Sequence, residues 1–185
     1  MSKSPGTGVL SGLPLLLARG RDALSGLAAR VFKKREIHTE IYIAADPGLI
    51  WSIITDLEKY REWNPFILRS RGKAQVGQRL ECRPRLPGSR RVHRFRPVVT
   101  RCVPPEVFAW KGHAILPGLA DGEHIFELFR AGEGVRLVHR QNFWGLAVPL
   151  VWKAIAPKTA AGFELMNRAL KERAEKKGTT ACPNT

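Results

Sequence analysis

The sequence predicts one α+β domain, in which a curved, seven-stranded antiparallel sheet wraps around a long C-terminal helix. Two observations support this prediction. Segments with strand-like alternation, separated by Pro and Gly turns, fill the chain from Phe66 to Gly145, and the apolar period becomes helical after Pro149. A length of 185 residues suits a single domain, large enough to bury a core around an internal cavity.

The first elements are expected to be a strand over residues 37–44 and then two short helices. Alternate residues of that strand are apolar, as in a half-buried strand. Asp46-Pro47 is typical of a helix start, because an N-cap residue is followed by proline in the first turn. The helix should run to about Asp56. A second one, over residues 58–62, should end before Asn64, which Pro65 biases toward extended conformations and which should bond to local backbone.

Six further strands are expected between Phe66 and Gly145. Because no long helix intervenes, neighbouring strands should pair antiparallel. In the last helix, one apolar stripe recurs at helical spacing, while lysines lie off it. The stripe contains Trp152, Ile155, Thr159, Phe163, Met166 and Leu170. The compact domain is expected over residues 36–177, followed by a disordered tail, 178–185.

The net charge of +15 is concentrated in two zones. Residues 1–35 contain seven Lys or Arg against Asp22, and residues 69–101 contain eleven against Glu81. Such zones indicate an anionic surface, either lipid headgroups or nucleic acid, although arginines that are merely solvated fit equally well. Only Phe95 is interleaved with the second zone as an aromatic residue, so lipid or solvent is favoured and no nucleic acid is expected.

Residues 1–35 are expected to form a basic amphipathic segment, with Leu13, Leu17, Leu24, Leu27 and Val31 on its apolar stripe. The segment could lie on an anionic membrane, be a transit peptide, or pack on its own domain or on a second subunit. The expected location is the cytoplasm, with a possible peripheral position on a membrane, or a mitochondrion if the segment is a transit peptide. No stretch of 18 continuous apolar residues suggests a membrane span.

The three cysteines, Cys82, Cys102 and Cys182, have neither CxxC nor Cys/His ligand spacing, which predicts reduced thiols. The five histidines show no metal-ligand spacing, and no glycine-rich nucleotide motif occurs. No metal and no cofactor is therefore expected.

Several short motifs recur in one order along residues 36–177, and their order and spacing resemble the SRPBCC superfamily. This is the START-like, helix-grip fold that includes polyketide cyclase/dehydrase and lipid transport members. The residues that carry the resemblance are Ile50, Trp51, Asp56, Tyr60, Trp63, Asn64, Pro65, Phe66, Gly77, Pro97, Trp110, Gly112, His124, Phe126, Phe143, Gly145, Gly162, Phe163, Met166, Asn167, Leu170 and Lys171. A glutamate is frequent in this superfamily where Gln141 stands, so an acid/base role at that position is in doubt.

The resemblance implies a cavity between helix and sheet that holds a lipid, quinone, polyketide or similar molecule. Read at period two, the strands place His124, Phe126 and Leu128 on one face and His139, Gln141 and Phe143 on another. The expected cavity residues are Trp63, Phe95, Trp110, His124, Phe126, Leu128, His139, Gln141, Phe143, Phe163 and Met166. Apolar walls with few polar groups suit a small-molecule pocket, but the same aromatics could fill a solid core.

The expected function is therefore the binding, and possibly the transfer, of a small hydrophobic ligand. One alternative is a polyketide cyclase/dehydrase-type enzyme, in which buried His124 or His139 acts as acid or base. Another is a protein-interaction module with a basic docking face. No motif supplies a nucleophile with its base, so the sequence favours binding over catalysis and assigns no catalytic residue. It leaves the oligomeric state open.

Overall fold

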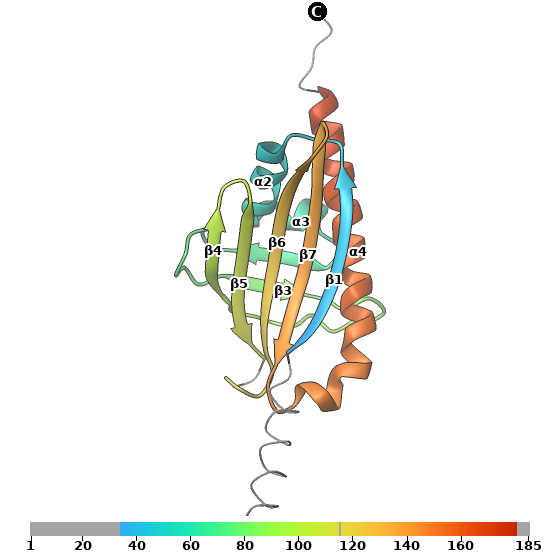
Figure 1. The fold of residues 1–185 in the computed structure, drawn as a ribbon. Coiled ribbons are helices and arrows are strands. Elements are labelled where there is room, and N and C mark those ends of the chain that lie inside the picture. Colours follow the sequence, from blue (N-terminus) through green and yellow to red (C-terminus); the bar gives the residue numbers. More distant parts are fainter. Residues whose placement is uncertain (1–33, 115, 181–185) are drawn as a thin grey trace, which may run out of the picture. The chain divides into compact units, whose positions relative to one another are not determined.

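The structure, a computed structural model, describes residues 34–114 and 116–180, with side chains as far as residue 178. The strands are β1 (Arg35–Ile43), β2 (Ile67–Arg71), β3 (Glu81–Pro84), β4 (Val98–Val103), β5 (Val107–His113), β6 (Asp121–Ala131) and β7 (Gly134–Trp144). The helices are α2 (Pro47–Thr55), the 3-10 turn η1 (Leu57–Lys59), α3 (Tyr60–Trp63) and α4 (Val148–Thr180). Their order confirms the predicted α+β succession of elements (Figure 1).

The strands form two sheets, so the prediction of one seven-stranded sheet was wrong. Five strands pair in the order β1-β7-β6-β5-β4, all antiparallel, and β2 pairs with β3 alone. Residues 78–82 do run antiparallel to residues 95–99 and share backbone hydrogen bonds with them, as between Cys82 and Phe95, but these contacts stay isolated and form no continuous ladder. Pro97 lies in the middle of this contact and has no N–H to donate, which interrupts the ladder.

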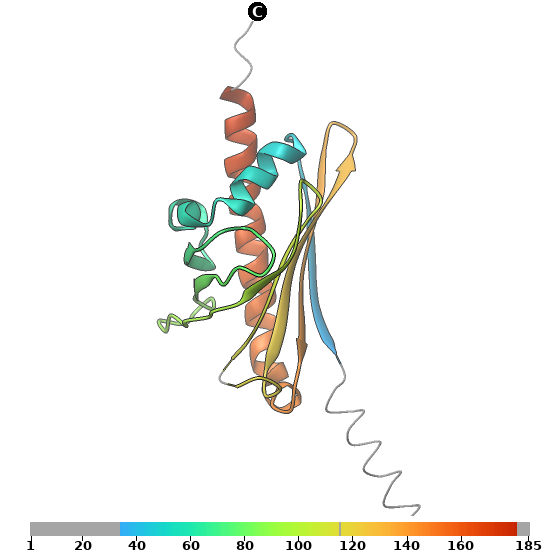
Figure 2. The same ribbon diagram turned by 90° about the vertical axis from the view of Figure 1, so that its left-hand side faces the viewer.

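Helix α4 packs on the same side of the five-stranded sheet as α2 and α3 (Figure 2). The core lies between these layers and is made of fully buried side chains from all of them. It includes Ile50, Ile54, Leu57 and Tyr60 from the short helices, Phe108, Trp110 and Phe126 from the sheet, and Phe163, Met166 and Leu170 from α4. The sheet and α4 therefore enclose the region where the ligand cavity was expected.

The predicted apolar stripe of α4 is confirmed, since all six of its residues are buried or half-buried. The sequence interpretation passed over Pro157, which lies inside this helix. Proline cannot donate to the carbonyl four residues earlier, but Pro157 is exposed, so water can reach that carbonyl. The helix continues to Thr180, so residues 178–180, which were assigned to a disordered tail, are helical. The rest of that tail lies outside the described residues.

The local signals before β2 act as expected. Asp46 caps α2, because its Oδ1 accepts from the N–H groups of Gly48 (2.7 Å) and Leu49 (3.2 Å). Asn64 Oδ1 accepts from Phe66 N (3.0 Å) and Ile67 N (2.8 Å), as predicted for this turn. These bonds turn the chain from α3 into β2.

The predicted amphipathic segment 1–35 lies outside the described residues except for its last two positions. Among the helices that the structure describes, none combines the length and the apolar character needed to cross a bilayer.

Candidate functional site

Five aromatic or imidazole rings meet between the sheet and α4, and each belongs to a side chain with at most 4% exposure. Trp110 of β5 stacks on His124 of β6, with ring centroids 4.4 Å apart. His139 of β7 stacks on Phe163 of α4 at 3.7 Å, and Phe126 lies 4.4 Å from His139. Antiparallel register brings these residues together, because His124 pairs with Gln141 and Phe126 with His139 across β6 and β7.

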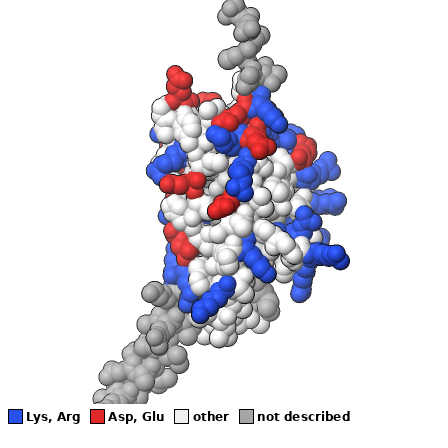
Figure 3. Space-filling view, turned by 90° about the vertical axis from the view of Figure 1, so that its right-hand side faces the viewer, with Lys and Arg blue, Asp and Glu red and all other residues white. Residues whose placement is uncertain are grey.

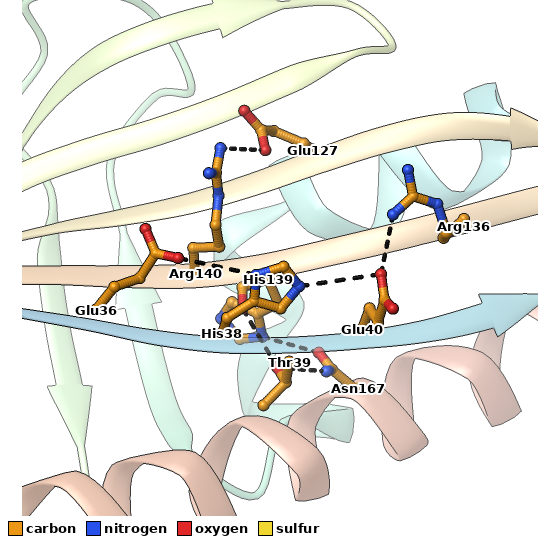
Figure 4. A network of polar contacts seen from close by, with 9 residues as sticks. All are labelled: Glu36, His38, Thr39, Glu40, Glu127, Arg136, His139, Arg140 and Asn167. Atoms are coloured by element: carbon orange, nitrogen blue, oxygen red, sulfur yellow. Dashed lines mark hydrogen bonds and ion pairs between the residues drawn. The ribbon is translucent and has the colours of Figure 1, made fainter.

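A chain of hydrogen bonds runs through this ring cluster. Gln141 Oε1 lies 3.1 Å from His124 Nδ1, and the two Nε2 atoms of His124 and His139 are 2.8 Å apart. On the far side, His139 Nδ1 lies 2.8 Å from the Asn167 side-chain amide, which is 3.0 Å from Thr39 Oγ1. These hydrogen bonds therefore connect β6 and β7 to α4 and β1, and Figure 4 shows the part that runs through His139, Asn167 and Thr39.

The hydrogen-bond partners of Gln141 determine which nitrogen of His124 carries the proton. Gln141 Nε2 donates to the backbone carbonyl of Asn142 (3.3 Å), so its Oε1 faces His124 and accepts from His124 Nδ1–H. A neutral His124 then offers only a lone pair at Nε2. The 2.8 Å contact to His139 consequently needs a proton from the His139 side.

Two proton arrangements satisfy that contact. With Asn167 Oδ1 toward His139, the Nδ1 atoms of His124 and His139 both donate. The two rings then share one proton between their Nε2 atoms and together carry one positive charge. A half-turn of the Asn167 amide instead makes His139 Nδ1 an acceptor, and the Thr39 hydroxyl then donates to Asn167 Oδ1. In that second arrangement both rings are neutral.

Burial decides between these arrangements. Desolvation penalises the charged form and lowers the pKa of His124 from 6.5 to about 3, although the hydrogen bond to Gln141 opposes this. Desolvation, followed by the neighbouring His124, also lowers the pKa of His139 well below its ordinary value. The neutral arrangement therefore holds at neutral pH, and protonation is coupled to a turn of the Asn167 amide.

The other face of the same strands carries a separate ionic network, which is exposed around His38 and half-buried at Arg140 and Glu127. His38 of β1 lies between Glu36 (3.8 Å) and Glu40 (3.9 Å), and Arg136 donates to Glu40 at 2.9 Å. Arg140 pairs with Glu127 on β6. Figure 4 shows this network together with His139 around β1 and β7, where period-two alternation separates the charged outer face from the buried imidazole.

The structure brings most of the predicted cavity residues together and leaves others apart. Trp110, His124, Phe126, His139, Gln141 and Phe163 share the ring cluster, and Met166 is buried in the same core. Leu128 is also buried, with 7% exposure.

Three predicted cavity residues have neighbours outside this cluster. Trp63 packs edge-on against Tyr60 (5.1 Å), and Phe143 against Trp152 (5.9 Å). The ring of Phe95 lies against Gly112, where an added Cβ would be 2.6 Å from Phe95 Cζ. That the whole set lines a ligand cavity stays a prediction.

Sequence reasoning missed Thr39 and Asn167 as members of the site. Each had a signal, namely a polar side chain at an inward position. Thr39 lies on the same face of β1 as Ile37 and Ile41, and Asn167 follows Met166 on the buried side of α4. Among the described residues, no group of three or more His, Cys, Asp or Glu side chains could hold a metal ion.

Comparisons with known proteins agree on the fold. A family model described as "Polyketide cyclase / dehydrase and lipid transport" matches residues 34–175, while no curated protein matches the chain. Many solved structures are similar, and three of them, at 14–18% identity, illustrate the likeness. The di-domain ARO/CYC StfQ from the steffimycin biosynthetic pathway has a TM-score of 0.64 at 16% identity, covering 92% of this chain and 63% of StfQ.

The Zhui aromatase/cyclase from Streptomyces sp. R1128 has a TM-score of 0.64 at 14% identity, over 78% of this chain and 96% of Zhui. A START superfamily protein from Mycobacterium smegmatis has a TM-score of 0.62 at 18% identity, over 77% of this chain and 98% of that protein. At such identities these structures establish the likeness of fold and nothing finer.

Proposed function

Because the chain belongs to the polyketide cyclase/dehydrase and lipid transport family, we propose that it binds a small hydrophobic ligand between the five-stranded sheet and α4. A lipid, a quinone or a polyketide has the matching chemistry. The observation that carries the proposal is the polar chain through His124 and His139 within an aromatic interior. A core built only for packing does not need such groups, whereas a pocket uses a few of them to orient its ligand.

Ligand entry requires a rearrangement, because the rings of Trp110, His124 and Phe163 contact one another. Displacement of α4 is one such change, and it would break two bonds of the polar chain, those of Asn167 with His139 and with Thr39. The ligand would then take the place of the Phe163 ring against the imidazoles.

Native mass spectrometry of the protein purified from its own cells tests this proposal. We expect a bound species of constant added mass that organic solvent releases, and Phe163→Ala should retain a different amount of it. Leu165→Ala is the matched control, because Leu165 is 39% exposed on the same helix. An unliganded protein that also fails to bind lipids, quinones and polyketides from a panel would contradict the proposal.

A second candidate is a polyketide cyclase or dehydrase-type activity, and the contact between the two imidazoles favours it. Two neutral, hydrogen-bonded rings can take up and release a proton next to a bound substrate. StfQ and Zhui are named as aromatase/cyclases, which is consistent with this chemistry on the same fold.

The His139→Gln variant distinguishes the two candidates. A binding protein should keep its ligand with at most a moderate loss of affinity, because Gln can still bond to Asn167. An enzyme should lose turnover of a polyketide substrate about 100-fold or more while still binding it. Absence of turnover in the unmodified protein would remove the enzymatic candidate and leave the first one standing.

A further inference from the structure

The outer face of the β2–β3 pair is a row of arginines. Inward residues are Ser70 and Cys82, which pair across the strands with Oγ and Sγ 3.3 Å apart. The residues that alternate with them, Arg69, Arg71 and Arg83, are exposed. Period-two alternation thus directs three guanidinium groups from two short strands to one solvent-facing surface.

Two hollows adjoin this surface. The larger, about 400 Å³, is lined by Leu68, Arg69, Arg71, Glu81, Arg83 and Val92. The smaller, about 80 Å³, is lined by Glu58, Arg61, Arg69, Ser70 and Arg71. Arg69 and Arg71 belong to both, so their charges border the two hollows at once. We call the residues that line the larger hollow the arginine face.

The positive charge of residues 69–101, which include the three arginines of the arginine face, is almost uncompensated. Glu81 is the one acidic residue in the zone 69–101, and its carboxylate accepts from Arg83 and Arg94, each at 3.0 Å. Hydrogen bonds from Arg94 and then Arg83 lower the pKa of this carboxyl. Within the part of the chain that the structure describes, the other nine cations of the zone form no ion pair.

Figure 3 shows that charge is unevenly distributed on the displayed face of the molecule. Lys and Arg side chains gather on one side of the displayed face, away from the five-stranded sheet, with few acidic groups among them. Such a concentration of one sign of charge attracts polyanions over several ångströms.

We propose that the arginine face docks on an anionic lipid bilayer, with headgroup phosphates in the larger hollow. Arg binds phosphate through paired N–H groups, and Val92, 45% exposed, adds an apolar contact beside them. A single-stranded nucleic acid would need exposed rings for stacking, whereas Phe95, the one aromatic residue of the zone, is half-buried against Gly112. The docking does not depend on what the interior binds.

Sedimentation of the full chain with vesicles of equal parts phosphatidylcholine and phosphatidylserine tests the proposal. The double variant Arg69→Gln/Arg71→Gln should bind about thirtyfold more weakly, since each cation at an anionic surface contributes a factor of about five. The control Arg130→Gln/Lys177→Gln removes the same charge from exposed positions of β6 and α4, and should bind like the unmodified chain.

A gain of affinity provides a second test that misfolding cannot imitate. Glu81→Gln removes the one acidic group and frees Arg83 and Arg94, so it should bind the same vesicles about fivefold more tightly. Added salt should weaken binding of every variant, and vesicles of phosphatidylcholine alone should not bind the arginine face.

Three results would overturn the proposal. The first is vesicle binding that the Arg69/Arg71 variant leaves unchanged, which would assign any membrane contact to another part of the chain. The second is an equal loss in the control variant, which would indicate net charge alone. The third is preference for a mixed-sequence RNA over vesicles at the same salt, lost in the Arg69/Arg71 variant, which would make this face an RNA site.

Discussion

At the scale of single residues, two buried histidines define the interior. His124 and His139 are 4% and 0% exposed, yet each ring nitrogen has a partner within 3.1 Å. An imidazole in such a place is tolerated because every polar atom is paired, and it stays neutral because no water solvates a charge there. His38, on the outer face of β1, is instead exposed to solvent and lies between two carboxylates.

We expect the buried pair to make stability depend on pH. The folded-state pKa of His124 is about 3, below its unfolded value of 6.5, so its contribution is complete above pH 6.5 and is lost as the pH falls toward 3. At pH 5 the loss for His124 amounts to about 2 kcal/mol of unfolding free energy. Urea unfolding at a series of pH values measures it.

The variants His124→Gln and His38→Gln provide the comparison for this pH series. The first should flatten the decline of stability between pH 6.5 and 5, and the second, at an exposed site, should leave it in place. An unchanged slope in His124→Gln would mean that the pair does not exclude protons in the folded state.

Trp110 is the residue whose truncation should cost most. The residue is 2% exposed, and the centroid of its ring lies 5.1 Å from that of Phe108, 4.4 Å from that of His124 and 5.6 Å from that of Phe126. Trp110→Ala should lower the unfolding free energy by about 3–5 kcal/mol. Trp144→Ala, at a half-buried position, should cost clearly less. A small loss at Trp110 together with weakened ligand retention would indicate that its ring lines an open pocket.

At the scale of elements, α4 approaches Phe66, the residue before β2, closely at Gly162. A Cβ on Gly162 would lie 2.4 Å from Phe66 Cδ2, and Phe66 packs edge-on against Phe163 at 5.6 Å. The absence of a side chain at Gly162 lets the helix come close to the chain that enters β2. Gly178, near the end of the same helix, meets nothing within 4 Å.

Replacing each glycine by alanine should therefore have opposite effects. Gly162→Ala should destabilise the protein by about 1–3 kcal/mol, because the new methyl group collides with the Phe66 ring. Gly178→Ala should leave stability unchanged or raise it by up to about 1 kcal/mol, through helix propensity alone. Thermal unfolding of both variants measures the difference, and equal effects would contradict this packing.

The sequence predicts the elements better than their assembly. The strands and α4 are local patterns, which is why the alternation in β1 and the stripe ending at Leu170 both hold. The split into two sheets depends on Pro97, whose effect on the pairing of residues 78–82 with residues 95–99 alternation does not reveal. For the same reason His124 and His139 were both placed inward, but their contact, and the part of Asn167 in it, required the register and the position of α4.

At the scale of the whole molecule, one continuous core of buried side chains lies between the five-stranded sheet and α4, and the proposed ligand would bind within this core. Any ligand that binds only the folded chain raises its stability by mass action. A ligand present at 100 times its dissociation constant should add about 2.7 kcal/mol to the unfolding free energy. A thermal-shift screen of lipids, quinones and polyketides checks this, and a uniform absence of shifts would contradict ligand binding.

The hydrogen bond between His139 and Asn167 has a consequence for how such a molecule could open. Asn167 belongs to α4 and His139 to the sheet, so separating the two layers removes the imidazole's partner and admits water to it. Hydration restores an ordinary proton affinity, and the open form therefore binds protons that the closed form rejects. Opening and proton uptake are thermodynamically linked, so a mildly acidic pH favours the open form even when the ligand and its concentration stay the same.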